Sequence, residues 1–139
     1  MVYVDTSVMI AMFLKEPSSN AALRWYESCK DELVSAVWCV TEFGSALGIK
    51  QRTQQITVSQ AKEAWESFEK LCSNDLNLVP VEPKHFFKAA ELTLQYESAL
   101  RAGDSLHLAC AMATQAKKIA TLDEVMAKNA QALKFRLSI

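Results

Sequence analysis

Short apolar runs alternate with longer amphipathic stretches along this chain. The first run, 2–4, is rich in β-formers and ends at three polar residues, after which apolar residues recur at helical spacing. By the same criteria, strands are predicted at 2–4, 32–34, 76–81, 118–122 and 133–137, and helices at 8–14, 21–29, 37–52, 57–71, 83–96, 103–117 and 123–130. Strands separated by helices are typical of an α/β fold, with a parallel sheet flanked by helices on both faces.

The length of 139 residues fits a single domain over 1–139. No internal repeat, linker or low-complexity segment interrupts it. No apolar run approaches the roughly 18 residues that a membrane span needs. The first residues already form the predicted strand, without a basic segment or a cleavage site, so we expect a cytoplasmic protein.

The four cysteines are far apart and form no C-x-x-C pair. This spacing favours reduced thiols that pack in the core. His85 and His107 have no cysteine partners at zinc-finger spacing, which argues against zinc. His107 comes one turn after Asp104; a catalytic role is open, but a packing role near a site is favoured.

The net charge of −1 is unusual for a protein that binds nucleic acid. If cations occupied four of the 16 acids, 15 basic side chains would face 12 acidic ones. That mild basic excess is compatible with RNA. The basic residues near the candidate acids, which could contact RNA, are Lys15, Lys50, Arg52 and Arg101.

Two aspartates stand at the ends of predicted strands where helices begin. Asp5 follows the first strand and Asp123 follows the fourth. Ligands bind at the carboxyl ends of strands in open α/β sheets, so both acids are candidates for one site. Each could instead cap its helix, although Thr6 or Ser7 could cap in place of Asp5.

Glu42 lies on a helix face without a lysine or arginine partner. Its neighbours on that face are Trp38, Cys39, Ser45, Ala46 and Ile49. A carboxylate without a partner in such a place needs a cation or a raised pKa. We therefore expect Glu42 to belong to the same site.

Asp104 opens a helix whose residues 105–116 carry no charge apart from a possible proton on His107. A helix that is apolar nearly all round is a buried one. Its N-terminus then lies inside a cleft or at its mouth. Asp104 could both cap this helix and bind a ligand.

Four carboxylates in one pocket imply a metal ion. Two of them about 4 Å apart repel by roughly 4 kcal/mol at an effective dielectric of 20, so a divalent cation is needed to keep them ionised. Oxygen ligands favour Mg²⁺ or Mn²⁺. Such a site activates water and neutralises a phosphate, which is the chemistry of phosphodiester hydrolysis.

Four segments resemble the acidic motifs of PIN domains, and VapC-type toxins most closely. They are VYVDTS (2–7), VTEF (40–43), RAGDSLHLA (101–109) and ATLD (120–123), and the third is the most specific. The resemblance covers the chain and implies a five-stranded parallel sheet and a Mg²⁺- or Mn²⁺-dependent endoribonuclease. It also implies a structured RNA substrate such as tRNA, a homodimer, and a small VapB-like antitoxin whose tail enters the active site.

The resemblance also implies roles for individual residues. Asp5 and Asp104 carry over as direct metal ligands, and Glu42 and Asp123 complete the acidic pocket. Thr6 or Ser7 would orient a carboxylate or a metal-bound water.

Other functions stay open. A PIN domain could bind RNA or a partner without turnover. A haloacid-dehalogenase phosphatase would need a second aspartate at the position of Ser7. A receiver domain would need an acidic pair and a late strand-end lysine, and neither is present.

Overall fold

A five-stranded parallel sheet is the centre of the computed structural model, which describes residues 1–139. The strand order is β3-β2-β1-β4-β5, and every neighbouring pair is parallel. The strands are β1 (Val2–Val4), β2 (Leu33–Ala36), β3 (Leu76–Val79), β4 (Lys118–Ala120) and β5 (Arg136–Leu137). The helices are α1 (Thr6–Phe13), α2 (Ser19–Ser28), α3 (Trp38–Arg52), α4 (Val58–Asn74), α5 (Pro83–Leu94), α6 (Ala102–Ala113) and α7 (Glu124–Ala132).

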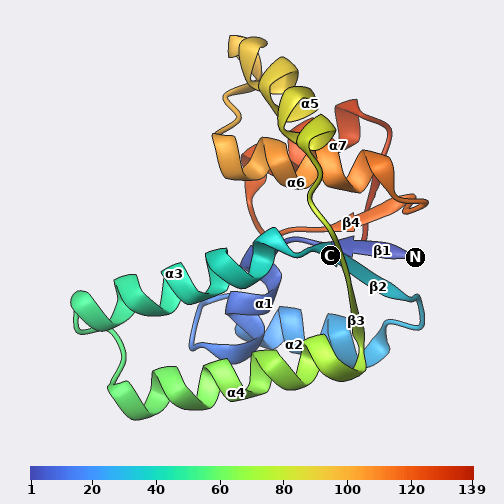
Figure 1. The fold of residues 1–139 in the computed structure, drawn as a ribbon. Helices are drawn as coiled ribbons and strands as arrows, with labels where there is room; N and C mark the ends of the chain where they lie inside the picture. Colours follow the sequence, from blue (N-terminus) through green and yellow to red (C-terminus); the bar gives the residue numbers. More distant parts are fainter.

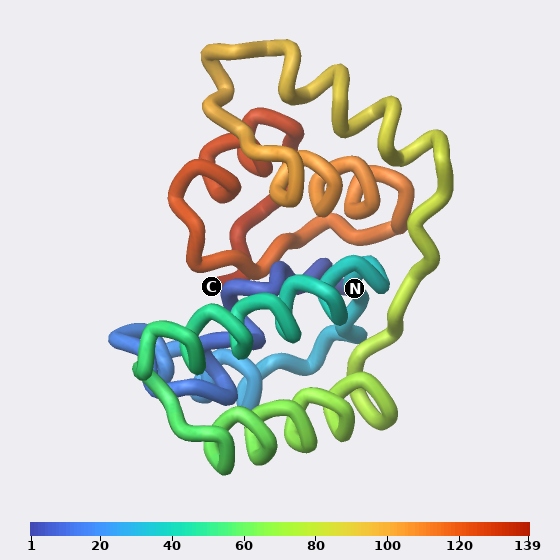
Figure 2. The backbone as a smooth tube through the Cα atoms, turned by 60° about the vertical axis from the view of Figure 1, so that its left-hand side comes forward, coloured from blue at the N-terminus to red at the C-terminus, as the bar shows by residue number.

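The helices form two layers that follow the order of the chain. Helices α1 to α4 lie on one face of the sheet, and α5 to α7 lie on the other (Figure 1). The backbone trace passes from the first layer to the second at β3, on the edge of the sheet (Figure 2). The first half of the chain therefore builds one layer and the second half builds the other.

The central strand β1 supplies side chains to both layers. Successive strand residues point to opposite faces, so Val2 and Val4 join a core with α1, α3 and α4. Tyr3 joins the other core, with α5, α6 and α7. Burial on both faces explains why this strand is a continuous apolar run.

The parallel α/β fold and all of the predicted strands and helices are confirmed, and the differences lie at element ends. The last strand, predicted at 133–137, is limited to β5 at Arg136–Leu137, because α7 continues to Ala132 and Lys134 adopts a left-handed φ of 72°. Helix α5 stops at Leu94, and a 3₁₀ turn, η1 (Tyr96–Ser98), follows. Thr57 is the N-cap of α4 rather than its first residue. No helix is both long and apolar enough to cross a membrane.

Candidate active site

The four acids predicted from the sequence converge at the carboxyl edge of the sheet. Asp5 follows β1 directly and Asp123 lies shortly after the neighbouring strand β4. Glu42 comes from α3 and Asp104 from the first turn of α6. All four side chains line one cleft of about 530 Å³.

A second cleft, of about 400 Å³, adjoins the first. It shares Glu42, Asp104 and Asp123 with the first cleft. It also includes Arg101, the only basic residue that lines either cleft. Both clefts are thus predominantly acidic, and Arg101 places one positive charge beside the three shared acids.

Asp5 is held by two hydroxyl groups that bond to the same carboxylate oxygen, and it is only 4% exposed. Its Oδ2 accepts hydrogen bonds from Ser7 Oγ at 2.5 Å and Thr121 Oγ1 at 2.8 Å. Asp5 occupies the N-cap position of α1, but its side chain makes no capping hydrogen bond. Neither Thr6 nor Ser7 replaces it as the cap, because both lie inside the helix. Their hydroxyls bond to Glu42 and Asp5 instead.

Asp123 does cap its helix. Its Oδ1 accepts a hydrogen bond from the Met126 backbone N–H at 2.7 Å, at the start of α7. The same side chain lines both clefts. Asp123 therefore caps α7 and also faces the clefts that the other acids line.

Glu42 is not the unpartnered carboxylate that the sequence indicated. Its Oε1 accepts a hydrogen bond from Thr6 Oγ1 at 2.7 Å and contacts His107 Nε2 at short range. Burial opposes ionisation of Glu42, but the hydrogen bond and the charge of His107 outweigh it and lower its pKa. The partner was missed because it lies on another helix, 65 residues away.

His107 is fully buried between the site and the sheet. Its Nδ1 lies 2.8 Å from Tyr3 Oη, and its Nε2 lies 3.1 Å from Thr6 Oγ1 and 3.9 Å from Asp5 Oδ1. Burial disfavours the charged ring, yet the hydrogen bond with Glu42 and the charge of Asp5 outweigh it and raise the pKa of His107. The sequence signal was an ionisable residue within the otherwise uncharged stretch 105–116, one turn after Asp104.

Asp104 is not the cap of α6, because the helix begins at Ala102 and Arg101 takes the N-cap position. The carboxylate forms no hydrogen bond with the protein. Burial raises its pKa, and the charges of Asp123, Asp5 and Glu42 raise it further, to about 6. Asp104 is thus close enough to the other three acids to be repelled by their charges when no cation is present.

The donor set fits a hard divalent cation. In Asp5, Glu42 and Asp123, protein donors hold one carboxylate oxygen and leave the other without a hydrogen bond; Asp104 has both oxygens free. No three of these groups are close enough to enclose an ion directly. Mg²⁺ usually keeps several of its waters and uses one or two carboxylates, which suits acids arranged around a wider cleft.

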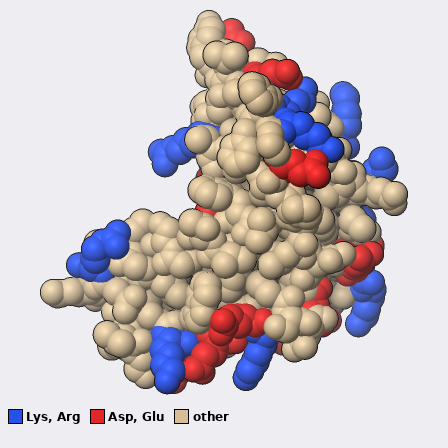
Figure 3. Space-filling model, viewed as in Figure 1, with Lys and Arg blue, Asp and Glu red and all other residues tan.

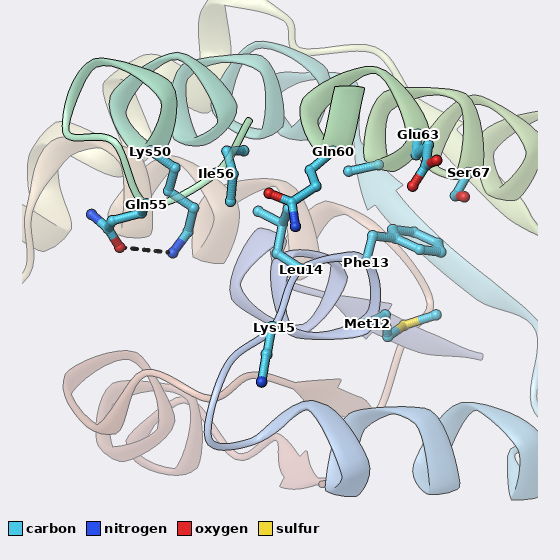
Figure 4. A pocket seen from close by; sticks show the side chains of 11 residues that line it. Met12, Phe13, Leu14, Lys15, Lys50, Gln55, Ile56, Gln60, Glu63 and Ser67 are labelled. Carbon is cyan, nitrogen blue, oxygen red and sulfur yellow. Dashed lines mark hydrogen bonds between the residues drawn. The ribbon is translucent and has the colours of Figure 1, made fainter. Parts of the chain in front are cut away.

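The other basic residues near the motifs lie elsewhere. Lys15 and Lys50 line a cleft of about 520 Å³ between the end of α1, the end of α3 and α4 (Figure 4). Lys50 forms an ion pair with Glu16 at 2.7 Å. Basic side chains are scattered around one face of the molecule rather than gathered in a patch (Figure 3). Of the basic residues near the motifs, only Arg101 borders the acids.

Fold and site together define a parallel α/β domain with an acidic cleft at the carboxyl ends of its central strands. The family model described as the PIN domain matches residues 2–132. The chain therefore belongs to the PIN-domain family. No curated protein sequence gives a significant match.

Solved structures share the fold at low identity. VapC20 of Mycobacterium tuberculosis, described as a sarcin-ricin loop cleaving toxin, is 16% identical with a TM-score of 0.74, over 93% of this chain and 95% of that one. VapBC2 of Rickettsia felis, bound to a promoter DNA fragment, is 17% identical with a TM-score of 0.62, over 99% and 97%. FitAcB of Neisseria gonorrhoeae is 14% identical with a TM-score of 0.67, over 99% and 96%.

Proposed function

We propose that this protein is a Mg²⁺- or Mn²⁺-dependent endoribonuclease and the toxin of a type II toxin–antitoxin pair. One observation carries the proposal: Asp5, Glu42, Asp104 and Asp123, from four distant segments, line one cleft. Membership of the PIN family and the likeness to toxin structures support it.

The four carboxylates would hold the cation, with Asp5 and Asp104 as direct ligands and Glu42 and Asp123 completing the pocket. When bound, such an ion lowers the pKa of a coordinated water and neutralises charge on a phosphate. Ser7 fixes Asp5 through the bond to Oδ2, so the other oxygen keeps a constant position.

Arg101 gives the substrate a place to bind. It lines the cleft that adjoins the acids, and a guanidinium donates two parallel hydrogen bonds to phosphate oxygens. The backbone of an RNA strand would thus lie across the acids, with one phosphate at Arg101. A folded RNA such as tRNA remains the proposed substrate class, and the cytoplasm is where we expect the protein to act.

Two protein partners belong to the proposal. A VapB-like antitoxin is supported by structural neighbours that are toxin–antitoxin complexes. A homodimer is supported by the apolar surface of α5 and η1, where Phe87, Leu94 and Tyr96 are 76%, 81% and 82% exposed. Light scattering of wild type and Phe87→Glu tests the dimer: we expect two copies for wild type and one for the variant.

RNA cleavage tests the enzyme directly. Purified protein is incubated with total tRNA in Mg²⁺, in Mg²⁺ with excess chelator, and as the Asp5→Asn variant. We expect discrete 5′ ends in the first reaction only. Equal cleavage in all three contradicts the metal mechanism. RNA binding without turnover in Mg²⁺ and in Mn²⁺ would favour the alternative, a PIN domain that only binds RNA or a partner.

A further inference from the structure

A chain of buried hydrogen bonds leads from the sheet to Glu42, with His107 at its centre. The Ala36 backbone N–H donates to Tyr3 Oη at 3.1 Å, and that oxygen lies 2.8 Å from His107 Nδ1. On its other side, the ring contacts Glu42 Oε1 through Nε2. Tyr3 and His107 are both 0% exposed, so water cannot replace these bonds.

The partners decide where the ring carries its proton. A buried hydroxyl needs an acceptor for its own hydrogen, and His107 Nδ1 is the acceptor next to Tyr3 Oη. A bare Nε2 would put its lone pair against the carboxylate of Glu42, which is repulsive. In the neutral ring, His107 therefore donates from Nε2 to Glu42. In the charged ring both nitrogens carry a proton, and Nε2 donates to Glu42 as well.

This donation divides the carboxylate of Glu42 into two unequal oxygens. Oε1 accepts from Thr6 and from His107. Oε2 makes no hydrogen bond of ordinary geometry and lies beside Gly103, where the indole N–H of Trp38, itself without a partner, also lies. A Cβ built on Gly103 would come within 3.0 Å of Oε2. The network thus holds one oxygen and leaves the other open, next to a residue without a side chain.

We propose that His107 is a positioning residue, which fixes the carboxylate of Glu42 so that Oε2 faces the cation. The inference rests on the proposed function, because it concerns that metal site. Groups that orient metal ligands by hydrogen bonds change affinity by 10- to 100-fold when removed. A packing residue of similar volume would fill the space without providing the bond.

Nitrogen NMR of the imidazole ring tests the proton position without any reaction. The chain has two histidines, so the variant His85→Gln leaves His107 as the only ring signal. We expect a proton on Nε2 at neutral pH, and a changed Nδ1 signal in Tyr3→Phe on the same background. A ring protonated only on Nδ1 overturns the proposal.

Mn²⁺ affinity, measured by calorimetry on the full chain, tests the consequence. We expect about 10- to 100-fold weaker binding for His107→Leu. His107→Gln should retain most of the affinity, because its amide N–H replaces Nε2–H. The matched control His85→Gln, far from the acids, should bind like wild type.

The outcomes separate the two proposals. Wild type that neither binds Mn²⁺ nor cleaves RNA removes the proposed function and this inference with it. Wild type that binds, with folded His107→Leu binding equally well, removes only the inference. Should His107→Leu fail to fold, Tyr3→Phe decides: affinity equal to that of wild type contradicts the proposal, and weaker affinity supports it.

Discussion

The corners β1–α1 and β4–α7 share a pattern, an apolar strand followed by an aspartate at a helix start, and differ in what their aspartates do. In each, an apolar strand ends near an aspartate that begins a helix. Asp123 accepts the Met126 N–H and caps α7. Asp5 caps nothing and is held by Ser7 and Thr121 instead. One acid therefore serves both helix and site, whereas the other serves the site alone.

Of the substitutions that test this difference between the two aspartates, Asp5→Asn should have the largest effect. Asp5→Asn keeps the shape and removes the charge, so RNA cleavage in Mg²⁺ should fall by at least about 100-fold, the upper range for losing a group that only orients a metal ligand. The melting temperature should stay close to that of wild type, because no capping hydrogen bond is lost. Cleavage within threefold of wild type would show that Asp5 is not part of the metal site.

Asp104 extends the comparison to an acid at a helix start that has no hydrogen bond. Its pKa of about 6 lies above that of the unfolded chain, so the folded state holds a proton that the unfolded state releases. Metal-free protein should therefore lose stability from this group as pH rises from about 4 to 6. Asp104→Asn should be more stable than wild type at pH 7 by about 1 kcal/mol, discounted because the group is only partly buried.

Melting curves at pH 4 and pH 7, with chelator, measure the difference in stability between Asp104→Asn and wild type. This difference should be small at pH 4 and larger at pH 7. Mg²⁺ should raise the melting temperature of wild type and leave the variant nearly unchanged. An Asp104→Asn protein that melts below wild type at pH 7 would refute the repulsion between the acids.

Asp123 allows its two roles to be separated. Asp123→Ala removes cap and charge, and should cost about 1 kcal/mol of stability as well as activity. Asp123→Ser keeps a capping oxygen and loses the charge, so stability should recover while cleavage stays low. If Asp123→Ser restored cleavage as well, the residue would matter only as a cap.

Gly103 gives the smallest effect. Gly103→Ala places a Cβ 3.0 Å from Glu42 Oε2, which should weaken Mn²⁺ binding a few-fold, since the carboxylate must shift. Stability should not fall, because alanine is the better helix former by up to about 1 kcal/mol. Gly44→Ala is the matched control, since its nearest neighbour, Trp65, is at 3.9 Å. Equal Mn²⁺ binding by both variants would show that the space beside Glu42 Oε2, which Gly103 leaves free, does not matter for the metal site.

The sequence alone determined the alternation of strands and helices, and with it the parallel sheet and the acids at its edge. Apolar runs and polar helix starts are local signals, and each sets the conformation of its own segment. The end of β1 at Asp5 could be predicted in this way, and so could the helix that carries Glu42.

Only the tertiary structure decided which groups share a hydrogen bond. Tyr3, Glu42 and His107 come from β1, α3 and α6, and no spacing along the chain relates them. Their contact depends on how α6 and α3 pack against the two faces of the sheet. The sequence could therefore predict a cluster of acids, while the histidine that orients one of them became visible only after folding.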